Sequence, residues 1–223
     1  MHIDYIRHIP IGQISIKIID TIYVTPNPKT IKFNKLPNSF IIKATHGSGW
    51  NIIVRDKSNI DFDKVVKKCD QIFGHVDGLV NAAADSNRGT VEETTVEFWD
   101  YQFAVNVRAP FLLTQQSVRI MKREKIAGSI VNILSVAAYC GLDCIMAYSA
   151  TKGALSTFTK NVANALRVDQ IRVNGINLGW TDTPAEDDVQ RKMGRPENWL
   201  EIAEQASPFG RLLKPIDVAR LSA

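Results

Sequence analysis

The sequence predicts an α/β fold: a doubly wound parallel sheet with helices on both faces. Short apolar runs that are typical of buried strands alternate with longer segments whose apolar residues recur at helical spacing. Strand–helix–strand repetition of this kind favours parallel pairing through right-handed crossovers. The chain has 223 residues, which is enough for one large domain with a sizeable core.

The composition of the chain changes near residue 60. Residues 1–60 contain fifteen Ile and one Ala, whereas residues 61–223 contain eighteen Ala. The first part holds short runs rich in β-branched residues, such as "QISIKII" and "SFIIKAT", which favour strands. We therefore expect residues 1–50 to form an atypical, strand-like N-terminal segment and residues 51–223 to form the main domain. A small β layer and a poorly ordered leader are both compatible with the first segment.

The elements of the main domain follow in order. Three apolar runs are suited to buried strands, and they cover residues 75–83, 128–135 and 171–179. Helical spacing of apolar residues predicts helices over 62–73, 95–124 and 146–167. Pro110 lies inside the second helix, where a kink is expected. Ligands of such sheets bind beyond the carboxyl ends of the strands, and the motifs described next fall there.

The stretch "AYSATKGAL", residues 147–155, places Tyr148 and Lys152 four positions apart. Residues at this spacing share one face of a helix. A tyrosine has a pKa of about 10 in water, which is too high for easy proton exchange at neutral pH. A fixed ammonium one turn away favours the phenolate and lowers that pKa. The pair therefore predicts a general acid/base.

Four stretches in order carry a resemblance to a known family: "NAAA" from Asn81, "AVNVRAP" around Asn106, a strand-end Ser135 thirteen residues before Tyr148, and "NLGWTDTP" downstream of Lys152. Together they resemble the short-chain dehydrogenase/reductase family, from about Asp56 to the C-terminus. The resemblance implies a Rossmann-like sheet. It also implies an NAD(P)-dependent oxidoreductase, with NAD or NADP as cofactor and a small alcohol or carbonyl compound as substrate.

The resemblance implies a role for each catalytic candidate. Tyr148 would be the general acid/base. Lys152 would lower the pKa of that tyrosine and hydrogen-bond the nicotinamide ribose. Ser135 would hydrogen-bond the substrate oxygen and stabilise developing negative charge. Asn106 would hold a water that links Lys152 to solvent.

Cofactor and substrate contacts are implied in the same way. The remaining cofactor candidates are Asp56 for the adenine, Asn81, Ala82 and Ala83 near the adenosine ribose, and Gly179, Thr181 and Thr183 around the nicotinamide carboxamide and the pyrophosphate. Cys140 and Trp180, with Ser135 and Tyr148, are the substrate candidates, and residues 185–200 are expected to form a mobile lid. Ala84 stands where the family has glycine. A positive φ there would cost about 1 kcal/mol.

The glycine-rich phosphate motif of the family, TGxxxGxG between a strand and a helix, has no counterpart in this sequence. The nearest stretch, "THGSGW" at residues 45–50, precedes a strand-like run and is interpreted as a turn. The first βαβ unit is therefore expected to be atypical or missing, and dinucleotide binding to be weak unless residues 1–50 rebuild an anion site. The C-terminal helix "KPIDVARLSA" is also expected to be shortened. The choice between NAD and NADP stays open.

Composition bears on the other functional classes. The net charge is +4 and the pI is about 8.9, but Lys and Arg are scattered, so no nucleic-acid partner is expected. The sequence has no apolar run as long as a membrane span and no signal peptide, so we expect no membrane contact and a cytoplasmic location. The cysteines, Cys69, Cys140 and Cys144, form no metal-binding pattern.

The resemblance implies a homodimer or homotetramer assembled through two long helices, near residues 96–123 and 147–167. Two alternatives to the enzyme are considered. The first is a truncated or rearranged non-catalytic relative with weak or no dinucleotide binding, which the missing glycine motif favours. The second is a basic nucleic-acid-binding module, which would bind DNA or RNA in a salt-sensitive way. Nothing in the charge pattern favours the second alternative.

Overall fold

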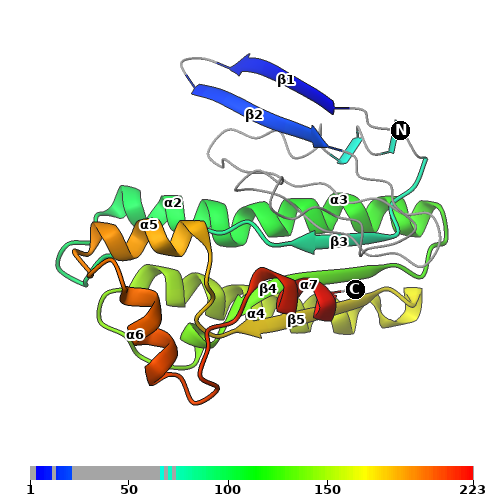
Figure 1. The fold of residues 1–223 in the computed structure, drawn as a ribbon. Coiled ribbons are helices and arrows are strands. Elements are labelled where there is room, and N and C mark those ends of the chain that lie inside the picture. Colours follow the sequence, from blue (N-terminus) through cyan, green and yellow to red (C-terminus); the bar gives the residue numbers. More distant parts are fainter. Residues whose placement is uncertain (1–3, 12–13, 22–65, 68–69, 72–73, 223) are drawn as a thin grey trace.

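The computed structural model describes residues 4–11, 14–21, 66–67, 70–71 and 74–222. Its described strands form two sheets (Figure 1). One is an antiparallel pair of β1 (Asp4–Ile11) and β2 (Ile14–Thr21). The other is a parallel sheet in the order β3–β4–β5. The predicted α/β class with a parallel sheet is confirmed.

The parallel sheet consists of β3 (Gly78–Asn81), β4 (Ser129–Ser135) and β5 (Arg172–Leu178). These strands lie within the three runs that the sequence predicts. The central strand β4 is almost entirely buried, as expected for a strand with neighbours on both sides. In Figure 1 the arrowheads of β3 and β5 point toward the side of the molecule where α5 and α6 lie.

The N-terminal pair only partly matches the prediction. The run "QISIKII" overlaps β2, but β1 was not predicted, because Arg7 and His8 interrupt the alternation of apolar and polar residues. Its register places three isoleucines of β1 opposite isoleucines of β2. The other strand-like runs before residue 60, the stretch "THGSGW" and Asp56 lie outside the described residues. Within the helix predicted over 62–73, residues 66–67 and 70–71 are helical.

The long helix predicted over 95–124 is one continuous rod with an irregular turn. It comprises α2 (Val96–Phe103), a π-helix (Ala104–Arg108) and α3 (Ala109–Arg123). Thr95 caps the start, because its hydroxyl accepts a hydrogen bond from the Phe98 N–H (3.2 Å). The irregularity precedes Pro110. That proline stands in the first turn of α3, where a missing N–H is tolerated.

The remaining helices surround the sheet. They are a 3₁₀ turn (Val136–Ala138), α4 (Met146–Leu166), a 3₁₀ turn (Arg167–Asp169), α5 (Pro184–Lys192), α6 (Trp199–Ala206) and α7 (Pro215–Ser222). The prediction for α4 is confirmed. The segment interpreted as a mobile lid contains α5 and the start of α6. The start of a helix in "KPIDVARLSA" is confirmed as α7.

Helices cover the parallel sheet and enclose the main core. In Figure 1, α4 passes behind β4 and β5, whereas α7 lies in front of them, next to β5. The core cluster joins the sheet to α3 and α4, and its buried members are Leu79, Met121, Ile130, Leu166, Ile171 and Val173. A smaller cluster of Trp199, Ala203 and Leu212 packs under α6. This second cluster gives the lid segment a core of its own.

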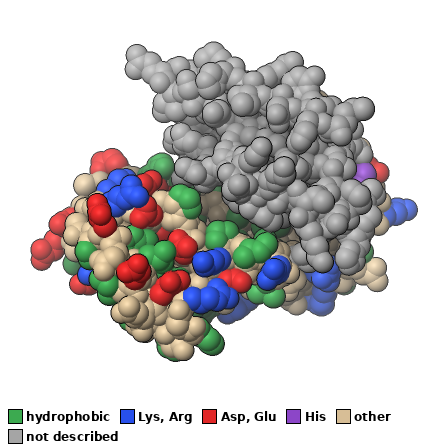
Figure 2. Space-filling view, in the orientation of Figure 1, with side chains coloured by type: hydrophobic (Ala, Val, Ile, Leu, Met, Phe, Trp, Pro, Cys, Tyr) green, Lys and Arg blue, Asp and Glu red, His purple; other side chains and the backbone are tan. Residues whose placement is uncertain are grey.

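The surface carries both signs of charge. On the face shown in Figure 2, Lys and Arg side chains lie among Asp and Glu side chains, without a basic stripe. No helix in the described residues is both long and apolar enough to cross a membrane. Those residues also contain no group of three or more His, Cys, Asp or Glu side chains placed to hold a metal ion.

Candidate active site

The candidate site lies at the carboxyl ends of the three parallel strands. Asn81 ends β3, Ser135 ends β4, and Gly179 follows β5. Tyr148 is the third residue of α4, and ten residues separate Ser135 from the start of that helix. The right-handed βαβ topology brings these four positions to one edge of the sheet, where ligands of such folds bind.

The structure brings Ser135 and Tyr148 together. The Ser135 side chain is close enough to the Tyr148 phenol to lower its pKa by hydrogen bonding. The Ser135 hydroxyl also accepts a hydrogen bond from the Ala137 N–H (3.2 Å), which fixes its position at the start of the 3₁₀ turn. Burial is the larger influence on the phenol and raises its pKa overall.

Lys152 lies one turn along α4 and is buried, with 2% of its surface exposed. Its Nζ lies 5.6 Å from the centroid of the Tyr148 ring and donates a hydrogen bond to the Ile133 carbonyl (2.7 Å). Burial lowers the pKa of this amine to about 8. Lys152 is not among the groups that shift the pKa of Tyr148 in this structure, so its effect on that pKa stays a prediction. Burial raises that pKa, and Ser135 rather than Lys152 is the main influence that opposes it.

Asn106 stands in the π-helix and is fully buried. Its Oδ1 accepts a hydrogen bond from the Asp85 N–H (2.8 Å), and its Nδ2 donates to the Asp85 carbonyl (2.9 Å). The same Nδ2 is within hydrogen-bond distance of Gln102 Oε1 (2.9 Å) and Thr151 Oγ1 (3.1 Å). These partners explain an asparagine in mid-helix, where the residue is intrinsically unfavourable. They use both hydrogens of the amide nitrogen, whereas Oδ1 accepts one described hydrogen bond and keeps a second lone pair.

Asp85 and Gln102 belong to this network, and sequence reasoning missed both. Gln102 Nε2 donates to Asp85 Oδ1 (2.5 Å), and Asp85 also accepts from the main-chain N–H and side-chain amide of Asn87. Both side chains are buried. One signal was available in the sequence: Gln102 and Asn106 are two polar amides four residues apart on an otherwise apolar helix face.

The segment after β3 has small side chains that would let a ligand approach its backbone. Asn81 is buried, and its Nδ2 donates to Asn132 Oδ1 (2.7 Å) on the neighbouring strand. Ala82 is exposed and Ala83 is half-buried, and neither has a side chain that would hold a ligand away from the backbone. The non-glycine residues with positive φ in the described part of the chain are Lys125 and Gln170. Ala84 therefore carries none of the strain considered above.

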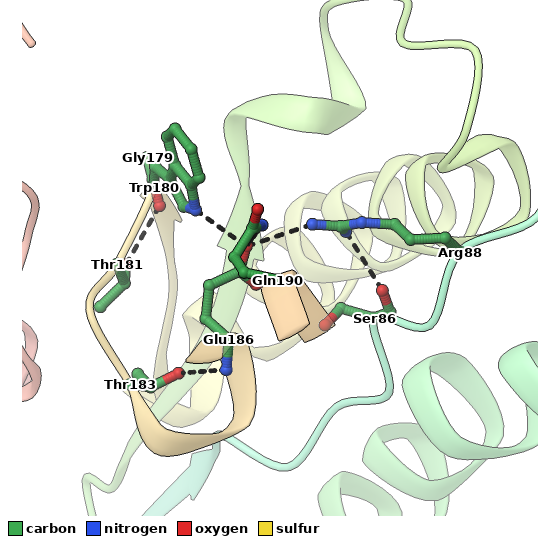
Figure 3. Close-up of polar contacts among 8 residues, drawn as sticks. All are labelled: Ser86, Arg88, Gly179, Trp180, Thr181, Thr183, Glu186 and Gln190. Atoms are coloured by element: carbon green, nitrogen blue, oxygen red, sulfur yellow. Dashed lines mark hydrogen bonds and ion pairs between the residues drawn. The ribbon is translucent and has the colours of Figure 1, made fainter. Parts of the chain in front are cut away.

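The loop after β5 holds Gly179, Trp180, Thr181 and Thr183 (Figure 3). Trp180 and the loop are fixed to the segment before α7, because the Leu213 N–H donates to the Trp180 carbonyl (3.0 Å) and the Asp182 N–H donates to the Leu213 carbonyl (2.8 Å). A Cβ added to Gly179 would meet nothing closer than 3.8 Å, so the exposed backbone there is open to a ligand. Thr183 caps α5 by accepting from the Glu186 N–H (3.1 Å).

Glu186 connects this loop to the segment after β3, and sequence reasoning did not single it out. Its Oε1 accepts hydrogen bonds from Trp180 Nε1 (2.8 Å), Gln190 Nε2 (2.7 Å) and Arg88 Nη2 (3.2 Å). Figure 3 shows the three donors converging on the one carboxylate. Arg88 and Glu186 also act on Tyr148: the guanidinium lowers the pKa of the phenol, and the carboxylate raises it.

The predicted substrate residues are placed less clearly. Trp180 is 48% exposed and stacks on Trp199 with ring centroids 5.9 Å apart. Cys140 is exposed, and its Sγ donates to the Val136 carbonyl (3.4 Å). No described contact joins Cys140 to Ser135 or Tyr148. Asp56, the adenine candidate, lies outside the described residues.

The residues that are described fit a nicotinamide cofactor on its reactive side. Small side chains line the end of β3, open backbone follows β5, and Lys152 has N–H donors beyond the one used by Ile133. The fit therefore concerns the described part of the site, where the proposed chemistry takes place.

Comparisons with known proteins agree with this arrangement. Residues 49–223 match a family model described as enoyl-(acyl carrier protein) reductase. An uncharacterized oxidoreductase of Thermotoga maritima is 35% identical over 159 residues, covering 71% of this chain and 63% of that protein. An NADP-dependent (R)-specific alcohol dehydrogenase of Lentilactobacillus kefiri is 31% identical over 184 residues, covering 79% of this chain and 71% of that enzyme.

A solved structure of an actinorhodin polyketide ketoreductase variant with NADPH is 28% identical and superimposes with a TM-score of 0.68. The match covers 72% of this chain and 64% of that chain. The chain thus spans slightly less than two thirds of the length of the Thermotoga protein and of the ketoreductase.

Proposed function

The chain belongs to the short-chain dehydrogenase/reductase family, and on that premise we propose that it is an NAD(P)-dependent oxidoreductase that interconverts an alcohol and a carbonyl compound. The observation that carries the proposal is the placement of Ser135 close to Tyr148 at the carboxyl edge of the sheet, with the Lys152 amine one helical turn away. The proposed cofactor is NAD or NADP, and the relatives named for NADP or NADPH support NADP.

In the direction of reduction, the bound nicotinamide supplies the hydride. The chain supplies the proton and the positioning. The Tyr148 phenol, kept protonated by burial, donates its proton to the substrate oxygen. The Ser135 hydroxyl donates a hydrogen bond to the same oxygen and stabilises the charge that develops on it. Lys152 binds ribose hydroxyls with its free N–H donors. Asn106 holds the π-turn against Thr151, the residue that precedes Lys152 in α4.

The cofactor would lie along the strand ends. Asn81, Ala82 and Ala83 would face the adenosine ribose, and Gly179, Thr181 and Thr183 would hold the carboxamide and the pyrophosphate. Asp56 would meet the adenine. Trp180 and Cys140 remain the substrate candidates of the proposal, beside Ser135 and Tyr148.

The proposal extends to domain, assembly and location. Residues 51–223 form the catalytic domain, and the chain forms a homodimer or homotetramer in the cytoplasm. The packing of Phe111 of α3 against Phe158 of α4 supports assembly through these helices. Their rings meet edge to face at 6.0 Å, and Phe111 is 41% exposed. Sedimentation of the purified chain measures the oligomeric state directly.

The test is turnover that depends on Tyr148. Oxidation of NADH or NADPH is followed by the absorbance of the reduced nicotinamide, across a panel of ketones and aldehydes. Tyr148→Phe is expected to lower kcat by at least about 100-fold, the usual contribution of a positioned acid. Tyr139→Phe is the matched control, because this phenol lies on the surface and bonds Ser156 (2.9 Å), and it is expected to keep normal turnover.

The non-catalytic alternative predicts a different outcome. If no carbonyl compound and neither coenzyme gives turnover that Tyr148→Phe removes, the enzyme proposal is rejected. The chain is then a non-catalytic relative, as the missing glycine motif had suggested.

A further inference from the structure

We propose that Glu186 is a positioning residue of the active site, which fixes the loop after β5 through Trp180 and balances the charge of Arg88 beside Tyr148. This inference rests on the proposed function and adds two residues to it, both outside the sequence motifs. Neither residue is expected to touch the reacting atoms. Their effect is on the geometry of the cofactor loop and on the protonation of the phenol.

The Glu186 carboxylate accepts three hydrogen bonds at a single oxygen. One oxygen, Oε1, accepts from an indole, an amide and a guanidinium at 2.8, 2.7 and 3.2 Å. The three donors come from the loop after β5, from α5 itself and from the segment after β3 (Figure 3). The carboxylate therefore joins three segments that are distant in sequence. Removing it would leave the Trp180 indole N–H without its partner.

Arg88 is held near the start of α4 by contacts of its side chain and of the next residue. Its Nη1 donates to the Ser86 carbonyl (3.1 Å), so the side chain is held within its own loop. The next residue, Gly89, donates its N–H to the Cys144 carbonyl (2.8 Å) and forms a bridge with Ile145. Ile145 directly precedes α4, the helix that carries Tyr148. Arg88 is thus fixed at the start of the catalytic helix.

A purely stabilising role does not account for this pair. The side chains of Arg88 and Glu186 are only 24% and 12% exposed. Ion pairs withdrawn from water lose much of their attraction to desolvation and contribute little to stability on balance. Paired charges at the edge of a site act on the ionisation of neighbouring groups instead.

The phenol of Tyr148 is the group they act on. Among the described residues, the side chains that shift its pKa are Ser135 at the end of β4, Arg88 and Glu186. The Nζ of Lys152 also faces the phenol, 5.6 Å from the ring centroid. The cation and the anion have opposite effects on the phenol, and the effect of Arg88 is the larger of the two. Removing either charge therefore shifts the pKa of the Tyr148 phenol, and the charge that remains sets the direction of the shift.

The charge experiment uses Glu186→Gln, Arg88→Met and the double variant. The ionisation of Tyr148 is followed by near-ultraviolet phenolate absorbance, as the difference from Tyr148→Phe in each background. Without Glu186, the remaining guanidinium favours phenolate, so the midpoint is expected to fall by about 0.5–1 pH unit. Without Arg88 the midpoint is expected to rise by a similar amount, and the double variant should lie between them.

The same shifts are expected in catalysis. For alcohol oxidation the phenolate is the base, so kcat/KM rises with pH through the tyrosine midpoint. Glu186→Gln should move this rising limb to lower pH, and Arg88→Met should move it to higher pH. Asp188→Asn is the matched control, because it removes one negative charge from the exposed side of the same helix. This control is expected to leave the limb in place.

The loop experiment separates geometry from charge. Glutamine at position 186 can still accept from Trp180 Nε1, whereas alanine cannot. Glu186→Ala is therefore expected to raise KM for the coenzyme about five-fold, the equivalent of one lost hydrogen bond, while Glu186→Gln leaves this KM unchanged. Trp180→Phe, which removes the same hydrogen bond from the other side, should match Glu186→Ala.

The outcomes distinguish the inference from the function. Phenolate titration needs no turnover. If the chain is inactive but the midpoint falls in Glu186→Gln and rises in Arg88→Met, the proposed function is rejected and the inference is kept. An active enzyme whose midpoint is unmoved, or moves the same way in both single variants, overturns the inference and keeps the function. Arg88→Lys, which retains the charge, should restore the midpoint shifted by Arg88→Met.

Discussion

At the scale of single residues, Tyr148 and Lys152 show how burial decides the protonation of an acid–base pair. Burial raises the pKa of the phenol and lowers the pKa of the amine, so both groups are driven toward their neutral forms. A neutral phenol is the form that donates a proton to a carbonyl oxygen. The isolated chain is thus prepared for reduction, and a shift toward phenolate has to come from groups that approach the site later.

The buried amine of Lys152 makes stability depend on pH. Its pKa is about 8 in the folded chain and about 10.4 when unfolded, so the unfolded state holds more protons between these values. The free energy of unfolding should therefore rise as pH increases from about 8 to 10.4, by about 3 kcal/mol. Below pH 8 the amine is protonated in both states, so burying its charge lowers the free energy of unfolding by this full amount.

Lys152→Met isolates this contribution, since the variant lacks the titrating group and keeps a side chain of similar length. The difference in unfolding free energy between the two proteins, measured by urea denaturation across the pH range, should shrink or change sign toward high pH. A difference that stays constant from pH 8 to 10 would contradict a depressed amine pKa.

The sequence identified some residues of the site and missed others for a physical reason. Tyr148 and Lys152 are one turn apart on a helix, and Ser135 ends a predicted strand, so local periodicity places all three. Arg88 and Glu186 are 98 positions apart, and their contact depends on how the segment after β3 packs against α5. No local pattern marks either residue, and the same holds for Asp85 with Gln102.

At the scale of elements, the long helix α2–α3 is shaped by polar contacts as much as by its proline. The sequence predicted a kink at Pro110, and the structure has a π-turn at Ala104–Arg108 instead. Asn106 lies in that turn and holds four polar groups on three segments. The extra residue of the π-turn lets the amide face Asp85 and Thr151, an arrangement that propensity alone does not reveal.

Asn106→Ala should therefore be costly. It leaves buried partners on Asp85, Gln102 and Thr151 without their hydrogen bonds, at about 1–3 kcal/mol for each group left unsatisfied. We expect the free energy of unfolding to fall by about 3 kcal/mol in urea denaturation, and turnover to fall with it. Asn161→Ala, at an exposed position of α4, is the control and should change stability by less than about 0.5 kcal/mol. Equal effects at the two positions would refute a structural role for the network.

The helices α5 and α6 show the limit of element prediction. Their segment contains Gly194, Pro184 and Pro196, and on these residues it was interpreted as a mobile lid, with no helix predicted there. The structure shows that Pro184 opens α5 as its first residue and that Trp199 anchors α6, with its Nε1 donating to Asp187 (2.9 Å). Proline and glycine here mark the ends of helices rather than their absence.

At the scale of the whole molecule, the parallel sheet and its crossover helices followed from alternation of strand and helix patterns. The strands β3, β4 and β5 were predicted because each is a short apolar run between polar segments. The region before residue 60 was predicted as short strand-like runs, and within it the structure describes β1 and β2. The weak dinucleotide binding expected from the sequence assumes that this region does not rebuild an anion site.

The last prediction concerns this affinity. The glycine loop and helix N-terminus that bind the pyrophosphate in the family are missing from the sequence, and with them a set of backbone N–H donors. We therefore expect a Kd for NADH and NADPH near 1 mM rather than 1 µM. At about 1 mM coenzyme, the weak affinity adds only about 0.4 kcal/mol to the free energy of unfolding, whereas the tight one would add about 4 kcal/mol.

Thermal unfolding with and without coenzyme distinguishes these values, because the tight case raises Tm by many degrees and the weak case barely moves it. AMP at the same concentration controls for binding of the adenosine half alone. A large increase in Tm with NADPH but not with AMP would show that residues before position 66 have rebuilt a pyrophosphate site. In that case the additional binding determinants would have to be sought among residues 1–65.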